Sequence, residues 1–274
     1  MGSPEAHIQT VEYSSGGIGS SLPPAPTRWV RSQPPVPFAA GIIESVSQRR
    51  GTFITFEGLD GCGKSTQLER LAEVLRARGL AVVTTREPGG TPTGERIRQL
   101  LLDVRTAGLD PSTELALMFA SRAQHLREVI LPSLGAGQIV LCDRFTDSSE
   151  AYQGGGRKLG GTAILDLHRI LCGALQPDLT ILMDSDLASS LERARRRNRD
   201  RGPESLDESR FESENRSFFT RVRNAYLEIA KREPQRVALV DARGTPDQTH
   251  AKILEIVFSR IGSATSPRRI QNAG

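Results

Sequence analysis

The sequence predicts an α/β domain with a five-stranded, mostly parallel sheet flanked by helices. Two observations carry this prediction. Short apolar and β-branched runs alternate along the chain with longer stretches of helical periodicity, which is typical of a parallel sheet covered on both faces. The alternation also begins with a strand, a glycine-rich loop and a helix, the arrangement that presents backbone N–H groups and a helix N-terminus to phosphate oxygens.

The elements follow in order from this first unit. Residues 53–57 form a short apolar run that predicts a buried strand, and residues 66–78 carry leucine and valine at helical spacing. Asp110 and Pro111 are a favourable N-cap and first-turn pair for a long helix. Further strands are expected at residues 81–85, 138–142, 179–183 and 237–240. Further helices are expected at residues 94–102, 110–134, 161–175, 187–197, 208–231 and 246–261.

Both ends of the chain differ from this pattern. Residues 1–50 are rich in Gly, Ser and Pro without sustained periodicity, which predicts a disordered N-terminal extension. They lack the apolar core of a secretory signal, whereas an organelle-targeting role, a misassigned start and a plain tail all stay open. Residues 263–274 are also expected to be disordered. The folded domain should therefore span residues 51–262.

Composition narrows the classes of function. No apolar stretch approaches the length that spans a membrane. The cysteines at 62, 142 and 172 form no C-x-x-C pair, which indicates reduced thiols in a cytoplasmic protein. The four histidines lack metal-ligand spacing, so no zinc site is expected. The net charge of +4 permits a nucleic-acid surface, but much of the excess is arginine at residues 193–201, which favours neutralisation of a polyphosphate.

The glycine-rich loop is the most specific motif. Residues 58–65 read Gly-Leu-Asp-Gly-Cys-Gly-Lys-Ser and fit the phosphate-loop pattern G-x-x-x-x-G-K-[ST]. An ordinary turn between strand and helix is the weaker alternative. We expect Lys64 to reach the β- and γ-phosphates and the Ser65 hydroxyl to ligate Mg²⁺. The predicted ATP-binding residues are Gly58, Leu59, Asp60, Gly61, Cys62, Gly63, Lys64, Ser65 and Thr66.

Polar residues follow two other predicted strands. Asp143 and Arg144 end the third strand, where they can serve the metal and a transferring phosphoryl group; strand capping is the weaker alternative. The second strand is followed by Arg-Glu-Pro-Gly-Gly-Thr at residues 86–91. This run offers a guanidinium donor, a carboxylate and a permissive backbone to a site, but it is equally compatible with an ordinary turn. Residues 143–157 supply hydroxyls, an amide, an aromatic ring and an arginine, the groups needed to hold a nucleobase and sugar.

The arginines at residues 193–201 lead from a helix into Gly202-Pro203. A solvated helix face is the simple explanation. Arginines on a mobile segment beside a phosphate loop can also close over ATP and stabilise transition-state charge, so an arginine-rich lid at about residues 193–210 is the functional alternative.

Together these motifs resemble the bacterial thymidylate kinases over residues 51–262, which would make this span a nucleoside monophosphate kinase domain with the P-loop kinase fold. The resemblance rests on the loop at 58–66, the run at 86–91, Arg122 within Phe-Ala-Ser-Arg-Ala-Gln at 119–124, and residues 143–157. It implies transfer of the γ-phosphoryl group of ATP to thymidine monophosphate (dTMP) for dTTP synthesis, with Mg²⁺ as cofactor and a cytoplasmic homodimer as the active form.

The resemblance also implies roles for single residues. Catalysis is expected from Lys64, Asp143, Arg144, Arg195 and Arg197, and metal binding from Ser65 and Asp143. The residues expected to bind the acceptor nucleotide are Asp60, Glu87, Arg98, Phe119, Arg122, Ser149, Tyr152 and Gln153. Arg98 and Arg122 would grip phosphate and base, Ser149 and Gln153 would contact the thymine, and Tyr152 would lie beside the sugar.

The sequence departs from the family pattern at two places. Some members carry a basic residue inside the phosphate loop, whereas the variable positions here, residues 59–62, hold none. This indicates the type whose catalytic arginine comes from the lid. The base-stacking phenylalanine of the family lies four residues before the helix arginine; Met118 holds that position and Phe119 is one residue later, so both stay candidates.

Three other functions also use a phosphate loop. Another nucleoside or nucleotide kinase would share the ATP site and differ in its acceptor pocket. A GTPase switch needs an Asn-Lys-x-Asp guanine reader, and no asparagine in this sequence precedes a lysine. A DNA-acting P-loop ATPase would hydrolyse ATP in response to nucleic acid. The prediction is a kinase with the small-molecule substrates ATP and dTMP and with no nucleic-acid or membrane partner.

Overall fold

The computed structural model describes the chain apart from residues 1–49, 107, 174, 201–209, 212–213 and 262–274. The predicted extension (except Arg50), the predicted C-terminal tail and most of the second half of the predicted lid lie outside the described residues. Within the described part, no helix is long and apolar enough to cross a membrane.

A five-stranded sheet forms the centre of the fold, with every strand pairing parallel in the order β2-β3-β1-β4-β5. The strands are β1 (Phe53–Glu57), β2 (Val82–Arg86), β3 (Ile139–Asp143), β4 (Leu179–Asp184) and β5 (Val237–Asp241). The chain crosses from β2 and β3 on one side of β1 to β4 and β5 on the other. Such a switch of direction opens a crevice at the carboxyl ends of the strands, where α/β proteins bind ligands.

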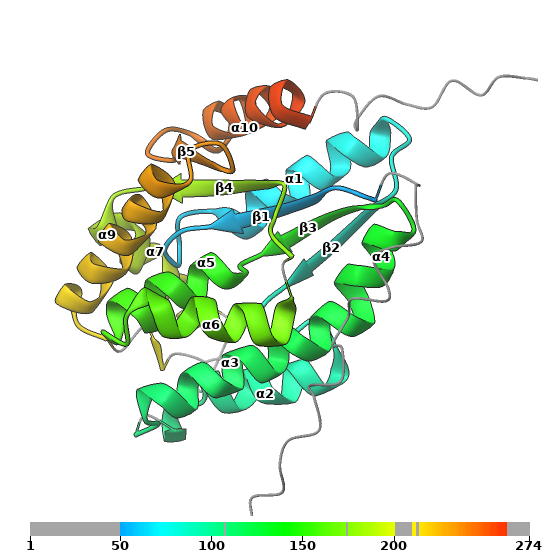
Figure 1. Cartoon of the computed structure of the whole chain (residues 1–274). Coiled ribbons are helices and arrows are strands. Elements are labelled where there is room, and N and C mark those ends of the chain that lie inside the picture. Colours follow the sequence, from blue (N-terminus) through cyan, green and yellow to red (C-terminus); the bar gives the residue numbers. More distant parts are fainter. Residues whose placement is uncertain (1–49, 107, 174, 201–209, 212–213, 262–274) are drawn as a thin grey trace, which may run out of the picture. The chain divides into compact units, whose positions relative to one another are not determined.

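Helices cover both faces of the sheet (Figure 1). The α-helices are α1 (Lys64–Ala77), α2 (Pro92–Leu102), α3 (Pro111–His125), α4 (Leu131–Gly135), α5 (Thr146–Ser149), α6 (Gly161–Cys172), α7 (Leu187–Asp200), α9 (Arg216–Arg232) and α10 (Pro246–Ile261). Shorter helical turns are η1 (Val104–Thr106), η2 (Leu126–Ile130) and η3 (Glu150–Gly156).

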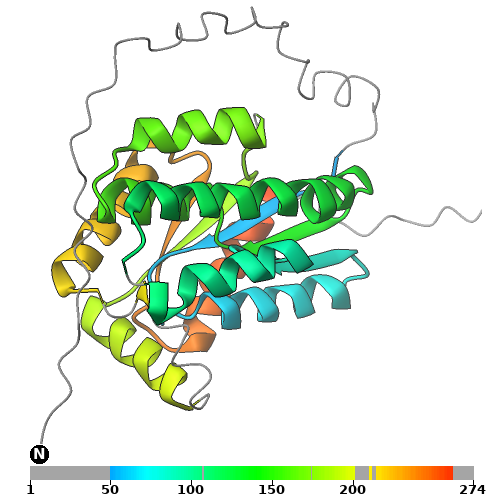
Figure 2. The same ribbon diagram turned by 90° about the horizontal axis from the view of Figure 1, so that it is seen from below.

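Two apolar layers hold the helices to the sheet. Ile54 and Phe56 of β1 point to the face where α1 and α10 pack, and Phe53 points to the other face, where α3, η2, α4 and α6 pack. Figure 2 shows α3 and α6, which belong to this second face. The alternation of side chains along a strand therefore divides β1 between two cores. The α/β class and the parallel sheet predicted from the sequence are confirmed.

The long helix predicted at 110–134 is continuous but changes its winding. It begins with the Asp110 side chain accepting from Ser112 N and proceeds as α3, the π-helical η2 and then α4. Pro132 lies in the first turn of α4 and has no N–H for the carbonyl one turn earlier. A π-helical turn just before this proline accommodates the missing hydrogen bond.

The segment after β3 is helical, which the sequence did not predict because η3 contains Gly154, Gly155 and Gly156. Close packing against α9 explains these glycines. A Cβ on Gly155 would lie 2.7 Å from Ala225 Cβ, and one on Gly156 would lie 2.6 Å from the Phe218 ring. The glycines therefore let η3 and α9 approach closely, and this packing replaces the helix propensity that the segment lacks.

Candidate active site

The phosphate loop connects the end of β1 to the start of α1. Gly63 takes the left-handed backbone conformation, with φ 99°, as the N-cap of α1. Lys64 is buried, and its Nζ donates to the carbonyl oxygens of Gly58 and Leu59 at 3.1 and 2.9 Å. The helix N-terminus and this ammonium group gather positive charge on one loop, as an anion site requires.

Ser65 and Asp143 meet between α1 and β3. The Ser65 hydroxyl donates to Asp143 Oδ2 at 2.7 Å. The second oxygen, Asp143 Oδ1, is buried and has no hydrogen-bond partner among the described residues. Oxygen ligands and an unsatisfied carboxylate fit Mg²⁺, which uses one or two protein ligands and completes its shell with water and phosphate. No cluster of three His, Cys, Asp or Glu side chains suited to a metal occurs in the described part of the chain.

Arg144 links the phosphate loop to the segment after β3. Its backbone has φ 72°, a left-handed conformation that costs a non-glycine residue on the order of 1 kcal/mol. Nη2 donates to Asp60 Oδ1 at 2.7 Å and to the Tyr152 hydroxyl at 3.1 Å, while Nη1 donates to Ser148 and Tyr226, both at 3.0 Å. Four contacts hold the strained backbone and fix the direction of the guanidinium.

A cavity open to solvent adjoins Arg144. Seven of the eight predicted acceptor-binding residues line it, namely Asp60, Glu87, Arg98, Arg122, Ser149, Tyr152 and Gln153. Pro88, Leu102, Met118, Arg144, Phe145, Ser148 and Phe211 complete its wall. Residues from five separate segments thus meet beyond the carboxyl ends of β1, β2 and β3.

The eighth predicted residue, Phe119, does not line this cavity. Its ring is fully buried in the core between α3 and the sheet, and the Arg122 guanidinium carbon lies 4.6 Å from its centroid. Met118, one residue earlier on α3, is in the cavity wall instead. Of these two neighbouring residues, Met118 therefore faces the cavity and Phe119 faces the core.

Arg122 is buried between the cavity and the core. Its Nε donates to Glu87 Oε2 at 2.6 Å, and Nη2 donates to Phe145 O and Ser149 Oγ at 3.1 and 3.0 Å. The remaining nitrogen, Nη1, is buried and has no partner among the described residues. Burial raises the pKa of Glu87, but the opposing effect of Arg122 and His125 is larger, so the pKa lies below its usual value. A buried cationic donor therefore remains available beside the cavity.

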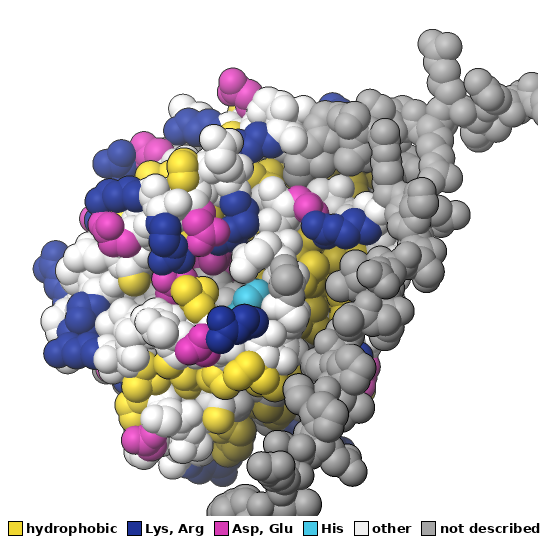
Figure 3. All heavy atoms as spheres, viewed as in Figure 1, with side chains coloured by type: hydrophobic (Ala, Val, Ile, Leu, Met, Phe, Trp, Pro, Cys, Tyr) yellow, Lys and Arg dark blue, Asp and Glu magenta, His cyan; other side chains and the backbone are white. Residues whose placement is uncertain are grey.

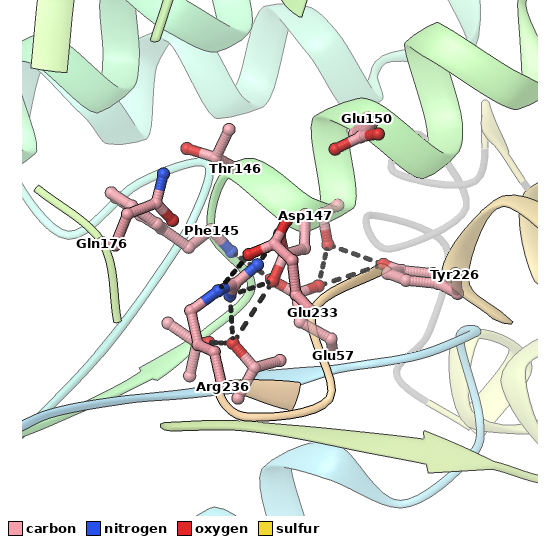
Figure 4. Close-up of polar contacts among 12 residues, drawn as sticks. Glu57, Phe145, Thr146, Asp147, Glu150, Gln176, Tyr226, Glu233 and Arg236 are labelled. Carbon is pink, nitrogen blue, oxygen red and sulfur yellow. Dashed lines mark hydrogen bonds and ion pairs between the residues drawn. The ribbon is translucent and has the colours of Figure 1, made fainter. Parts of the chain in front are cut away.

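The segment from Phe145 to Gly156 divides its side chains between two directions. Ser149, Tyr152 and Gln153 recur at helical spacing and face the cavity. Asp147 turns away and accepts from Arg236 at 2.7 and 2.9 Å, and Figure 4 shows Asp147 and Arg236 pointing toward one another. The sequence predicted that residues 143–157 supply groups for nucleotide binding, but it did not separate the side chains that face the cavity from those that point away.

Glu57 ends β1 beneath Arg144 and is fully buried. Its carboxylate accepts from Phe145 N at 2.7 Å, from the Ser148 hydroxyl at 2.5 Å and from the Tyr226 hydroxyl at 3.1 Å (Figure 4). Burial, with Asp147 nearby, raises the pKa of Glu57 to about 7, although Ser148 and Arg144 oppose the shift. Glu57 thus ties three elements together below the site.

The arginine-rich helix α7 packs against the phosphate loop. A Cβ on Gly61 would lie 2.0 Å from Ser190 O, and Arg193 Nε donates to Gly61 O at 2.8 Å. Arg195 is exposed on the same helix. Arg197 belongs to α7, but its side chain lies outside the described residues. The structure therefore brings the start of the predicted lid to the loop.

Several residues at or beneath the cavity escaped prediction, among them Phe211, Glu57 and Tyr226. Phe211, just after the predicted lid, packs edge-on against Tyr152 with centroids 5.9 Å apart. Tyr226 of α9 accepts from Arg144, and both Tyr226 and Glu57 of β1 contact Ser148, another partner of Arg144. Glu57 had one signal, a charged residue at the end of an apolar strand beside the phosphate loop. Nothing in the local sequence marked the other two, because they reach the site only through tertiary packing.

Two regions that carry cationic side chains therefore meet at Arg144. The phosphate loop lies on one side, and the cavity with Arg98 and Arg122 lies on the other. Arg144 contacts Asp60 of the loop and Tyr152 of the cavity wall. Such an arrangement can align a triphosphate with a second phosphorylated molecule and neutralise the charge between them.

Comparisons with known proteins agree with this geometry. A family model described as thymidylate kinase matches residues 56–253. The thymidylate kinase of Desulfovibrio desulfuricans is 52% identical over 195 residues, which are 71% of this chain and 89% of the relative. That of Geobacter sulfurreducens is 46% identical over 219 residues, 80% of this chain and 100% of the relative. The crystal structure of thymidylate kinase from Ehrlichia chaffeensis aligns with a TM-score of 0.59 and 34% identity, covering 76% of this chain and 98% of that one.

Proposed function

The chain belongs to the thymidylate kinase family, and we propose that it transfers the γ-phosphoryl group of ATP to the 5′-phosphate of dTMP. One observation supports this reaction above the others: Arg144 touches both the phosphate loop and the adjoining cavity. A hydrolase has no use for a second nucleotide pocket. A kinase needs one at this place, because donor and acceptor phosphates must be in line.

On the donor side, the phosphate loop from Gly58 to Thr66 would hold ATP. Lys64 exchanges its contacts with the loop carbonyls for the β- and γ-phosphate oxygens. Ser65 and Asp143 would hold Mg²⁺, a choice supported by the unsatisfied Asp143 Oδ1. When bound there, Mg²⁺ would neutralise part of the negative charge of the phosphates. Lys64 and Arg144 supply the remaining positive charge in the transition state.

On the acceptor side, the cavity would hold dTMP. Arg98 binds its phosphate, and the buried Nη1 of Arg122 donates to a carbonyl oxygen of the base. Ser149 and Gln153 lie beside the base, and Tyr152 packs beside the sugar.

Glu87 holds Arg122, and Asp60 holds Arg144. Met118 lines the cavity and would contact the thymine ring, whereas Phe119 packs against Arg122 from the core.

Lid arginines complete the charge around ATP. The contact of Arg193 with Gly61 O supports this assignment, because it anchors α7 beside the triphosphate site. Arg195 and Arg197, further along α7, are the candidates for the catalytic arginine. The catalytic domain would comprise residues 51–262.

A homodimer is the form that we propose in solution. Leu165 and Ile170 of α6 are large apolar side chains with 41% and 61% of their surface exposed. Figure 3 shows apolar side chains gathered over α3 and α6. Burial of this surface against a second copy would remove it from water. We also propose a cytoplasmic location, since all three cysteines are free thiols.

An acceptor panel tests the proposed reaction. Purified protein is incubated with ATP, Mg²⁺ and each nucleoside monophosphate in turn, and ADP formation is followed by a coupled assay. We expect dTMP to give the highest kcat/KM. Preference for another monophosphate would favour the rival nucleotide kinase. ATP hydrolysis that DNA stimulates, without phosphorylation of any monophosphate, would favour the DNA-acting ATPase.

A further inference from the structure

Glu114 is a fully buried carboxylate in the first turn of α3. Gln153 Nε2 donates to its Oε1 at 2.8 Å, and Nη2 atoms of Arg157 and Arg210 donate to its Oε2 at 3.0 and 2.7 Å. The donors come from η3, from the residue that follows η3, and from the segment before α9. A carboxylate that pairs with two guanidinium groups acts only as an acceptor.

This contact fixes the side-chain amide of Gln153. A primary amide has a donor nitrogen on one side and an acceptor oxygen on the other, and only the nitrogen can face a carboxylate. Reversal of the amide would place two acceptors against each other in a buried site and would be disfavoured by a factor on the order of ten or more. Gln153 lines the cavity, and no described residue donates to its Oε1. The oxygen is therefore the atom left for a ligand.

We propose that Glu114 is a positioning residue that sets base specificity by holding Gln153 with its acceptor oxygen toward the acceptor nucleotide. The proposal rests on the proposed function, because it assumes that this cavity holds dTMP. Thymine presents N3–H as a donor next to the acceptor O4, whereas cytosine presents N3 as an acceptor next to a donor amine. Gln153 Oε1 can accept from N3–H of thymine, whereas it would face the acceptor N3 of cytosine and repel it.

The charge of Glu114 is essential to this role. A neutral amide at position 114 could either donate to Gln153 or accept from it, so both orientations of the Gln153 amide would be open. The site would then lose its preference for a base with N3–H. A purely structural Glu114, which only anchors Arg157 and Arg210, would affect stability and overall activity but leave the preference for thymine over cytosine intact.

Selectivity between two pyrimidines separates these roles. We would measure kcat/KM for dTMP and for deoxycytidine monophosphate (dCMP) with wild type, Glu114→Gln, Gln153→Met and Glu214→Gln. Glu114→Gln and Gln153→Met are each expected to narrow the dTMP-to-dCMP ratio about ten-fold or more. Glu214→Gln is the matched control: Glu214 also pairs with Arg157 but does not contact Gln153, so the ratio should not change.

Several outcomes would overturn the proposal. A folded Glu114→Gln protein with the wild-type ratio would show that Glu114 is only an anchor. If this variant fails to fold, Glu114→Asp keeps the charge beside the two arginines and withdraws it from Gln153, and an unchanged ratio there counts equally against the proposal. Wild type itself must reject dTMP methylated at N3; efficient phosphorylation of that analogue would refute the acceptor role of Gln153. Failure of wild type to phosphorylate dTMP would instead refute the proposed function.

Discussion

Arg144 donates to Asp60 across 2.7 Å, so the guanidinium group that follows β3 lies against a carboxylate of the phosphate loop. Tyr152, Ser148 and Tyr226 hold the same guanidinium from the other side. The positive charge between the two proposed phosphate sites is therefore fixed before either nucleotide binds, which is the condition for effective electrostatic stabilisation of a transition state.

Arg144→Lys should lower kcat by about 100-fold at saturating ATP and dTMP, because an ammonium group cannot make four directed contacts at once. Steady-state kinetics with both substrates varied would measure the effect. Arg232→Lys is the matched control, since Arg232 makes a similar two-pronged pair with Glu150 away from the cavity. Equal kinetics for the two variants would argue against a role of Arg144 between the phosphates.

Lys64→Ala should reduce kcat by about 100- to 1,000-fold while the protein stays folded. The residue sits at the start of α1, where alanine is well tolerated, and its ammonium group contacts only loop atoms and Cys62 among the residues described. Circular dichroism would confirm folding, and Lys252→Ala, at an exposed lysine of α10, would serve as control. Full activity in a folded Lys64→Ala protein would contradict the proposed mechanism.

Asp143→Asn should raise the Mg²⁺ concentration that gives half-maximal activity by about ten-fold or more, because a neutral amide is a weaker ligand for a hard cation. Activity would be titrated with Mg²⁺ at fixed ATP. Asp166→Asn, at an exposed aspartate of α6, should leave the titration unchanged. An Asp143→Asn protein with the wild-type Mg²⁺ requirement would exclude Asp143 as a ligand.

The stability of the domain should depend on the protonation of Glu57. Its pKa is about 7 in the folded chain and about 4.5 when unfolded, so between these values the folded state binds more protons. The free energy of unfolding should consequently fall as pH rises from about 4.5 to 7, by on the order of 3 kcal/mol at most. Glu57→Gln imitates the protonated acid and should flatten this slope. Urea unfolding at several pH values would measure it; a slope that persists in Glu57→Gln must arise elsewhere.

Ile170→Glu should weaken self-association by placing a charge on the exposed apolar face of α6. Sedimentation velocity over a range of concentrations would report the change. Leu239→Glu is a suitable control, because Leu239 is similarly exposed but belongs to β5. Unchanged sedimentation of the Ile170→Glu protein would exclude α6 from a dimer interface.

The local sequence predicted secondary structure best where neighbouring residues alone determine the conformation of an element. The strand before the phosphate loop, the loop and α1 follow from adjacent residues, and the other strands were displaced by at most one residue at an end. Asp110 with Pro111 located the start of α3 for the same reason. Arg122, Ser149 and Gln153 were also predicted, but through the family resemblance, since no local pattern places three distant residues around one cavity.

Tertiary packing decided the remainder. The glycines of η3 contradict helix propensity and become helical only because α9 lies so close. Phe211 reaches Tyr152 from a segment whose own sequence gives no sign of it. Glu114 looked like an ordinary charged residue near a helix start, yet it is fully buried and faces donors from 39 to 96 positions away in the chain.

The close packing of α7 against Gly61 restricts how this enzyme can change over evolutionary time. A side chain of any kind at position 61 would collide with the backbone of α7, because even its first carbon would lie 2.0 Å from Ser190 O. A descendant could not acquire a basic residue there by one mutation and keep its present helix position. It would have to displace α7 first, and that intermediate would lose the Arg193 contact before any replacement existed. At position 61, a basic residue of the phosphate loop is therefore incompatible with the present position of α7.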